Sequence, residues 1–199
     1  MSNSSYEKPD HWTIKAKKEG YPARSVYKLQ EIDRKFGLVR KGMRILDIGA
    51  APGSWSLWVL KRLEGTGLLM ALDLQELGIE QGSPNFRFIR GDLYEPAVRS
   101  ELLAQGPYNL VLSDAAPATT GNRVVDQGQS EAIVEAVIDY AEACLGPGGS
   151  MVAKIFQGGA EAGLIKRLRG RFAAARGFKP EACRPGSFET YLVATGFKA

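Results

Sequence analysis

Four aspartates recur at or next to the ends of short apolar runs in the middle of the chain: Asp47, Asp73, Asp92 and Asp114. Each run is apolar enough to form a strand covered on both faces, and the segments between the runs have helical periodicity. Strands that alternate with helices form parallel sheets, which bind ligands outside the carboxyl ends of the strands. We therefore expect these carboxylates to surround a shared ligand site.

The turn after the first run reads Asp-Ile-Gly-Ala-Ala-Pro-Gly-Ser-Trp, from Asp47 to Trp55. A Gly-rich turn from a strand to a helix lets a nucleotide-like cofactor approach the backbone. The spacing of Gly49 and Gly53 differs from the Gly-x-Gly-x-x-Gly of dinucleotide folds, so a nicotinamide cofactor fits poorly. Asp73 follows at about the distance where Rossmann-like folds place the acid that holds ribose hydroxyls. Together these residues predict a nucleoside cofactor.

Two residues near this turn each allow two interpretations. Trp55, just inside the following helix, is either a wall of the cofactor pocket or an aromatic residue of the core. Asp92, in Arg-Gly-Asp, either accepts a hydrogen bond from an adenine amino group or caps the next helix. The residues alone leave both choices open.

Apolar periodicity and Gly/Pro punctuation predict the elements that position these residues. We expect a helix over 24–36 that ends at Gly37, and a helix over 54–63 with Ser54 as its cap. Strands are expected over 43–49, 67–73, 86–92, 108–114 and 149–156, and further helices over 95–105, 127–145 and 161–175. Residues 178–198 read as two strands around an Arg-Pro-Gly-Ser turn. The expected fold class is α/β: a Rossmann-like, mostly parallel sheet with helices on both faces and a C-terminal antiparallel strand pair.

The length and composition fit one domain over residues 1–199, because 199 residues with 44% hydrophobic content can bury one sizeable core. No apolar run approaches the roughly 18 residues of a membrane span, and the first residues lack the pattern of a secretory signal. We expect a soluble, cytoplasmic protein. Cys144 and Cys183 are interpreted as reduced packing residues, and His11 as a surface or RNA-contact residue rather than a catalyst. No metal site is expected.

The charge is unevenly distributed along the chain. Residues 1–44 hold 11 of the 26 lysines and arginines and 5 of the 22 acids, which gives a net charge of +6. The remaining residues hold 15 lysines and arginines and 17 acids, which gives −2. This asymmetry indicates a basic N-terminal extension and helix over residues 1–40 that binds a polyanion, with a solvated basic helix as the alternative. A second basic group is either a solvated helix face or an RNA contact: Lys166, Arg167, Arg169, Arg171 and Arg176.

Five segments resemble the FtsJ/RrmJ-type (RlmE-like) ribosomal RNA ribose 2′-O-methyltransferase family, from about Tyr21 to the end. They are RSVYKLQEID, LDIGAAPGSW, SDAAP followed by TGN and VD, PGGSMVAKIFQG and ETYLVATG, in the family's order and spacing. A chance match to all five is hard to imagine. One departure is Pro-Gly-Ser-Trp where many relatives have a second glycine, which concerns the detail of the loop and not the cofactor.

The resemblance implies methyl transfer from S-adenosylmethionine to a ribose 2′-hydroxyl of RNA in a Rossmann-like methyltransferase fold. The family's catalytic set corresponds to Lys28, Asp114, Lys154 and Glu189. Its cofactor residues correspond to Gly53, Trp55, Asp73, Asp92 and Asp114. A ribose hydroxyl is a poor nucleophile until its proton is removed, so Lys154 is interpreted as the base. Asp114 and Glu189 would orient Lys154, and Lys28 would neutralise a phosphate or steer the hydroxyl.

Without the resemblance, Lys154 and Glu189 have ordinary structural explanations. Lys154 would extend to solvent from the end of its strand, and Glu189 would be a polar residue on an edge strand.

The stretch Ala-Thr-Thr-Gly-Asn after SDAAP resembles the ribosomal branch of the family more than the transfer-RNA branch. This resemblance implies that the target is a uridine of large-subunit (23S-type) ribosomal RNA. An oligomer is not implied, and we expect a monomer. A transfer-RNA ribose methyltransferase remains an alternative. A small-molecule methyltransferase would not explain the basic N-terminal segment or Lys28, and a base methyltransferase would need an Asn/Asp-Pro-Pro-aromatic motif. A non-catalytic ribosome-assembly factor should have lost at least one of the four catalytic residues.

Overall fold

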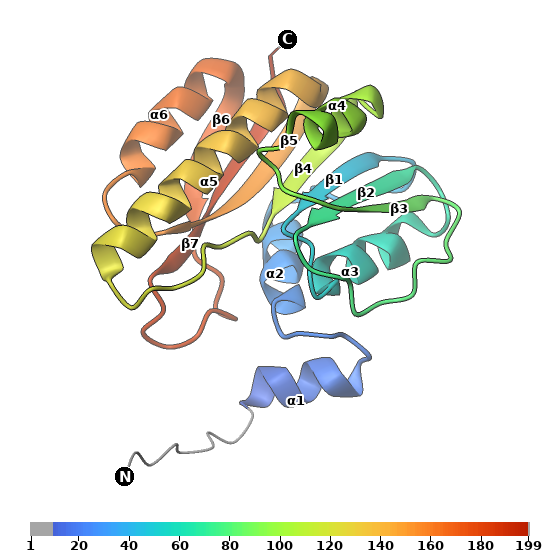
Figure 1. Ribbon diagram of the computed structural model, residues 1–199, viewed down its shortest axis with the longest axis horizontal. Helices are drawn as coiled ribbons and strands as arrows, with labels where there is room; N and C mark the ends of the chain where they lie inside the picture. Colours follow the sequence, from blue (N-terminus) through green and yellow to red (C-terminus); the bar gives the residue numbers. More distant parts are fainter. Residues whose placement is uncertain (1–9, 199) are drawn as a thin grey trace.

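A computed structural model describes residues 10–198, so residues 1–9 of the predicted N-terminal extension lie outside the described part. Its centre is a seven-stranded sheet in the order β3-β2-β1-β4-β5-β7-β6 (Figure 1). The strands are β1 (Arg44–Ile48), β2 (Leu68–Asp73), β3 (Phe86–Arg90), β4 (Tyr108–Ser113), β5 (Leu145–Phe156), β6 (Phe172–Phe178) and β7 (Glu189–Phe197). Strands β1 to β5 pair in parallel, and β7 runs antiparallel to both β5 and β6. The predicted fold class is confirmed.

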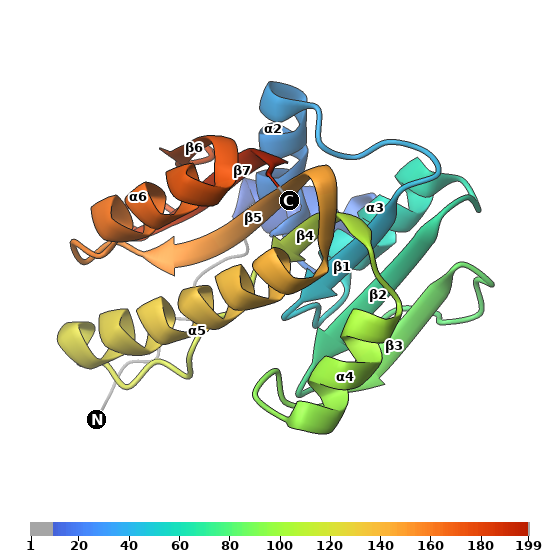
Figure 2. The ribbon, with the colours of Figure 1, turned by 90° about the horizontal axis from the view of Figure 1, so that it is seen from above.

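Six helices flank the sheet in this part of the chain: α1 (His11–Lys18), α2 (Val26–Phe36), α3 (Ser54–Leu63), α4 (Pro96–Ala104), α5 (Arg123–Cys144) and α6 (Glu161–Arg171). Figure 2 shows α4 and α5 on one side of the sheet and α2 and α3 on the other. Because side chains alternate along a strand, Leu46 of β1 belongs to the core on the face with α4, α5 and α6, whereas Ile45 belongs to the core on the face with α2 and α3. The sheet therefore has a buried core on each face.

Helix α2 is part of this core rather than an extension from it. Its side chains Val26, Leu29 and Ile32 recur at helical spacing and are fully buried against α3 and the sheet. The helix ends where predicted, because Gly37 adopts the left-handed conformation (φ 64°) and its N–H donates to the carbonyl of Asp33. Of the predicted extension over 1–40, α2 therefore belongs to the body of the fold.

The end of α6 differs from the prediction. The helix stops at Arg171, and residues 172–178 form β6, which pairs with β7 from Phe172 opposite Phe197 to Phe178 opposite Tyr191. Three consecutive alanines favour a helix locally, but pairing with β7 buries Phe172 and Ala175 in the sheet. An antiparallel pair is therefore present at the C-terminus, but its first strand is residues 172–178 and not the segment just before the Arg-Pro-Gly-Ser turn, which lies in the connection 179–188.

Two helix starts also differ from the prediction. Gly53 (φ 107°), not Ser54, is the N-cap of α3, and the Ser54 hydroxyl instead accepts a hydrogen bond from the Ala23 N–H at 2.7 Å. Helix α5 begins at Arg123, where the Asn122 side chain accepts from the Val124 N–H. Among residues 10–198, no helix combines the length and apolar character that crossing a membrane would require.

Candidate active site

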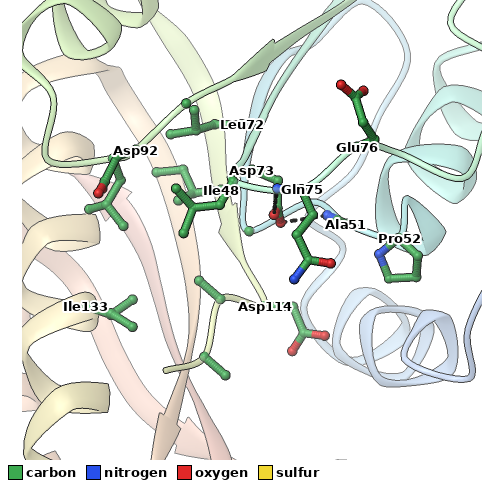
Figure 3. A pocket seen from close by; sticks show the side chains of 16 residues that line it. Ile48, Ala51, Pro52, Leu72, Asp73, Gln75, Glu76, Asp92, Asp114 and Ile133 are labelled. Atoms are coloured by element: carbon green, nitrogen blue, oxygen red, sulfur yellow. Dashed lines mark hydrogen bonds between the residues drawn. The ribbon is translucent and has the colours of Figure 1, made fainter. Parts of the chain in front are cut away.

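A cavity of about 390 Å³ lies at the carboxyl ends of the parallel strands. Its wall includes three of the four predicted acids, Asp73, Asp92 and Asp114, which Figure 3 shows around one hollow. Apolar side chains from the strand ends and from α5 complete the wall: Ile48, Leu72, Leu93 and Ile133. The carboxylates and the apolar surface thus converge where the topology of an open parallel sheet places a ligand.

Asp73 is held rigidly at this cavity by two backbone hydrogen bonds. Its Oδ2 accepts from the Ala51 N–H and its Oδ1 from the Gln75 N–H, both at 2.8 Å (Figure 3). Each carboxylate oxygen retains a second acceptor position, so the group can still receive hydroxyl donors from a ligand. The same bonds fix the loop after β1 against the end of β2.

Asp92 lines the cavity, and its Oδ1 accepts from the Tyr94 N–H at 2.9 Å. Helix α4 begins later, with Glu95 as its N-cap. The alternative that Asp92 caps this helix is therefore wrong.

The glycines of the first turn allow close approach between loops. Gly49 has φ 76°, and a Cβ atom there would lie 2.5 Å from the Cα atom of Ala115. A Cβ atom added at Gly53 would similarly lie 3.0 Å from the Ile79 side chain. The turn after β1 can therefore touch the turn after β4, which carries Asp114.

Asp47 does not line the cavity, so the expectation that all four acids would surround it is wrong. Asp47 lies inside β1 and is fully buried, and its Oδ2 accepts from the Ser56 hydroxyl of α3 at 2.6 Å. Its Oδ1 has no hydrogen-bond partner among the described residues. The pKa of this carboxyl is raised to about 7, mainly by burial and partly by the nearby Asp114 and Asp73 carboxylates, against the lowering effect of the hydrogen bond from Ser56.

Trp55 is buried behind the cavity rather than in its wall. Only 2% of the residue is exposed, its Nε1 donates to the Ser25 carbonyl at 2.9 Å, and its ring lies 5.8 Å from that of Tyr191. This favours the core interpretation of Trp55, which joins α2, α3 and β7. Neither Gly53 nor Trp55 lines the cavity, and their assignment to the cofactor stays a prediction.

The predicted catalytic side chains form two ion pairs. Lys154 Nζ lies 3.1 Å from Asp114 Oδ1 and donates to the Asp114 carbonyl at 2.7 Å. Lys28 Nζ lies 2.6 Å from Glu189 Oε1. All four side chains are only 10–16% exposed, so both pairs are largely shielded from water. Glu189 thus pairs with Lys28, and the expectation that it orients Lys154 together with Asp114 is wrong.

The register of the last strands explains this arrangement. In the antiparallel pair of β5 and β7, Lys154 lies opposite Tyr191 and Phe156 opposite Glu189. Residues opposite each other in an antiparallel pair share a face of the sheet, and so do residues two positions apart on one strand. The side chains of these two residue pairs therefore all point to the face that α2 covers. Glu189 therefore meets Lys28 of α2, at the end of β5 beyond the last residue of β4.

The sequence analysis missed Tyr191. Its hydroxyl donates to Asp114 Oδ1 at 2.7 Å, so Asp114 accepts from Tyr191 and pairs with Lys154 at the same oxygen. Complete burial, and then the charges of Asp114 and Glu189, raise the pKa of Tyr191 well above its usual value of 10. Its position two residues after Glu189 in a strand was the available signal.

Four of the five basic residues of the predicted group near α6, all except Lys166, have structural partners. Arg167 pairs with Asp139 and Glu142 of α5, and the Arg169 Nε donates to the Ala175 carbonyl. Arg171 and Arg176, the latter on β6, lie over phenylalanine rings. These contacts favour a structural role over RNA contact. Both predicted packing cysteines, Cys144 and Cys183, are reduced and buried.

Comparisons with known proteins agree with this geometry. The model of the FtsJ-like methyltransferase family matches residues 21–197. The chain is 46% identical to the Ribosomal RNA large subunit methyltransferase E of Treponema denticola over the full length of both chains. It is 43% identical to the protein of that name from Sorangium cellulosum, over 98% of this chain and 91% of the relative.

Solved structures show the same fold. A Plasmodium falciparum structure described as a ribosomal RNA methyltransferase aligns with a TM-score of 0.77 and 28% identity over 89% of this chain and 98% of its own. Human methyltransferase-like protein 13, solved with S-adenosylhomocysteine, aligns at 0.61 and 15% identity over 85% and 82%, a likeness of fold alone. Because the family model covers nearly the whole chain and relatives above 40% identity match it from end to end, the chain belongs to the FtsJ-like methyltransferase family.

Proposed function

We propose that this methyltransferase transfers a methyl group from S-adenosylmethionine to a ribose 2′-hydroxyl of RNA, a uridine of large-subunit ribosomal RNA. The observation that carries the proposal is the position of Asp114, which lines the cavity and also pairs with Lys154. A proton-accepting amine is thereby held beside the cavity. The names of the relatives, which specify large-subunit ribosomal RNA, favour this substrate over transfer RNA.

The cavity fits S-adenosylmethionine, the methyl donor. Its volume is in the range of small-molecule sites, and Asp73 offers fixed oxygens to a ribose diol. The apolar strand ends offer a surface for a purine ring. The described residues of the wall include four acids, with Glu76 the fourth, and no lysine or arginine. Such a wall suits a ligand whose sulfur and amino group are both positively charged.

The donor supplies an electrophilic methyl group, and the protein must supply the proton acceptor. In its neutral form, Lys154 Nζ takes the proton of the 2′-hydroxyl as the ribose oxygen attacks. The Asp114 carbonyl and carboxylate hold Nζ in place, and the Tyr191 hydroxyl fixes the rotamer of the carboxylate. This pair thus sets the direction from which the hydroxyl approaches the methyl group.

Lys28 and Glu189 support the acceptor RNA in this proposal. Their ion pair lies between α2 and β7, on the face of the sheet that also carries Lys154. A phosphate next to the target ribose can draw the ammonium of Lys28 from Glu189, while Glu189 keeps Lys28 in place before RNA binds. A non-catalytic RNA-binding protein would have no need for a shielded Lys154–Asp114 pair at the wall of a donor cavity.

The direct test is methylation of defined RNA. Purified protein, S-adenosylmethionine with a labelled methyl group and large-subunit ribosomal RNA, free or in the assembled subunit, are incubated together, and the digested nucleosides are analysed by mass spectrometry. We expect 2′-O-methyluridine from the wild type and none from Lys154→Ala. A methylated base, or a product from transfer RNA alone, would contradict the proposal. Mapping of ribose methylation in cells with and without the gene then identifies the nucleotide.

A further inference from the structure

A second cavity, of about 420 Å³, lies between α1, α2 and the end of β6. Aromatic and basic side chains share its wall: Trp12, Tyr27 and Phe178 with Lys15, Arg34 and Lys35. None of these residues belongs to the proposed catalytic set or to the wall of the donor cavity. Aromatic residues interleaved with cations are the combination that single-stranded nucleic acids bind.

The cations lie over the aromatic rings. Lys15 Nζ is 4.7 Å from the ring centre of Tyr27 and 5.5 Å from that of Trp12, and Lys35 Nζ is 4.5 Å from the ring centre of Phe178. The Trp12 and Tyr27 rings themselves lie 4.9 Å apart. A nucleotide presents a flat base next to a phosphate, and here a flat aromatic surface lies next to an ammonium group.

The walls of this cavity are tied together before any ligand binds. Glu31 accepts hydrogen bonds from the backbone N–H groups of Glu181 and Ala182 at 2.7 and 2.9 Å. Arg24 donates to the Ala182 carbonyl and pairs with Asp10 at the start of α1. The carboxylate of Glu31 is therefore engaged by backbone donors but keeps its charge, so the three cations of the wall exceed its two acids, Glu31 and Glu181, by one positive charge. Lys15 also lies 3.9 Å from Glu19, outside the wall, and must exchange this partner when it contacts a phosphate.

The cavity lies next to the second ion pair. Tyr27 in its wall directly precedes Lys28 on α2. Cys183 follows Glu181 by two residues and lies close to Glu189, since burial first and then the Glu189 charge raise the pKa of its thiol. Helix α2 and the connection 179–188 thus form the partition between this cavity and the Lys28–Glu189 pair. A chain that places its target ribose at Lys154 passes this partition with its neighbouring nucleotides.

We propose that the second cavity binds one unstacked base of the substrate RNA, in a nucleotide near the methylated one. Trp12 provides the stacking surface, Phe178 the opposite wall, and Lys15 and Lys35 contact the flanking phosphates. This inference rests on the proposed function, because it assigns a further contact to the same RNA. It predicts that the target region is single-stranded or becomes so in the complex.

The test compares Trp12→Ala and the double variant Lys15→Ala/Lys35→Ala with the wild type. The matched control is Lys61→Ala, because Lys61 also lies over an aromatic ring, 4.2 Å from the centre of Tyr21, but outside this cavity. Binding of the large-subunit RNA is measured over a series of salt concentrations. We expect Trp12→Ala to weaken binding roughly 5- to 150-fold, the double variant to flatten the salt dependence, and the control to match the wild type.

Tryptophan fluorescence provides a second readout that a folding defect would not mimic. Trp55 and Trp58 are at most 9% exposed, whereas Trp12 is half-buried in the cavity wall. RNA should quench the emission of the wild type, and Trp12→Phe should lose the quenching but keep most of the affinity, because phenylalanine still stacks.

The results separate this inference from the function on which it rests. If the wild type methylates RNA but Trp12→Ala binds it equally well, or if Lys61→Ala loses as much affinity, the cavity is not a base-binding site. Quenching by an acidic peptide but not by RNA would also overturn the inference. If the wild type neither binds nor methylates any RNA, the proposed function fails as well. Calorimetry with S-adenosylmethionine should give the wild-type affinity for every variant.

Discussion

Two regions of the molecule differ sharply in charge. The donor side is defined by Asp47, Asp73 and Asp92 at β1 to β3, which form no ion pair among the described residues, whereas Glu76 of the cavity wall pairs with Arg90 at the surface. The acceptor side, defined by Lys28, Lys154, Glu189 and Tyr191, pairs each acid with a lysine. This division matches the ligands, because a cationic methyl donor suits unpaired carboxylates and a polyanionic RNA suits lysines that can exchange partners. Asp114 belongs to both sides, so the methyl group and the hydroxyl should meet there.

The largest expected effect lies on the acceptor side, at Lys154. Arginine keeps the positive charge but cannot act as a base. Both Lys154→Arg and Lys154→Ala should therefore lower the single-turnover methylation rate by about 10²- to 10⁴-fold. Calorimetry should show that both variants still bind S-adenosylmethionine, because the donor side is unchanged. Substantial turnover by Lys154→Arg, with RNA and donor affinities intact, would contradict the assignment of Lys154 as the base. The lysine would then only position its neighbours by its charge, and the acceptor side would supply no proton acceptor.

A smaller effect is expected on the donor side, at Asp73. Removing a charged acceptor costs about 1.5 to 3 kcal/mol per hydrogen bond, so Asp73→Ala should weaken donor binding roughly 10- to 150-fold. RNA affinity should not change. Since Asp73 also holds the backbone at Ala51 and Gln75, Asp73→Asn serves as the control that keeps one acceptor oxygen, and thermal melting separates binding from stability. An unchanged dissociation constant for Asp73→Ala would exclude this carboxylate from the donor site.

The smallest effect concerns Asp47, the buried acid of the donor side. Its pKa is about 7 in the folded protein and near 3.8 in the unfolded chain, so the folded state holds the proton more tightly. This contribution to stability is present at low pH and is lost as the pH rises toward 7. Asp47→Asn mimics the protonated form and keeps an acceptor for Ser56. We expect it to raise Tm by roughly 2–4 °C or more at pH about 8, and to leave it nearly unchanged at pH about 4.

Asp92→Asn is the matched control for this measurement, because Asp92 is a partly exposed acid of the same side. Equal gains in Tm from both substitutions would mean that the repulsion among the acids, rather than the burial of Asp47, limits stability above pH 7.

Most of the donor side could be predicted from the sequence because its acidic residues lie at the ends of strands. Asp73, Asp92 and Asp114 each follow an apolar run, and parallel topology alone brings such positions together. Asp47 was misplaced because it lies opposite Ala71, two residues before Asp73, and therefore stays inside the sheet, where it accepts from Ser56 of α3. The helix-like alanines of β6 were likewise assigned by local preference, which pairing with β7 overrides.

The acceptor side was harder to predict because it depends on register between distant segments. The family resemblance identified Lys28, Lys154 and Glu189, but which acid pairs with which lysine follows only from the β5–β7 pairing and the position of α2. Tyr191 gave no chemical signal, since a tyrosine in an apolar strand reads as a core residue. Its hydroxyl reaches Asp114 only because it lies opposite Lys154.

The insertion of β7 between β5 and β6 has a consequence for how the protein is made. During translation, β1 to β4 emerge early and can assemble the donor side, whereas β5 and β6 emerge before the strand that must separate them. Glu189 and Tyr191 arrive on that strand, so a nascent chain can hold a methyl donor before it can orient its base. Such late, non-local pairing is slow, and catalytic competence should therefore be the last property to appear as the polypeptide matures.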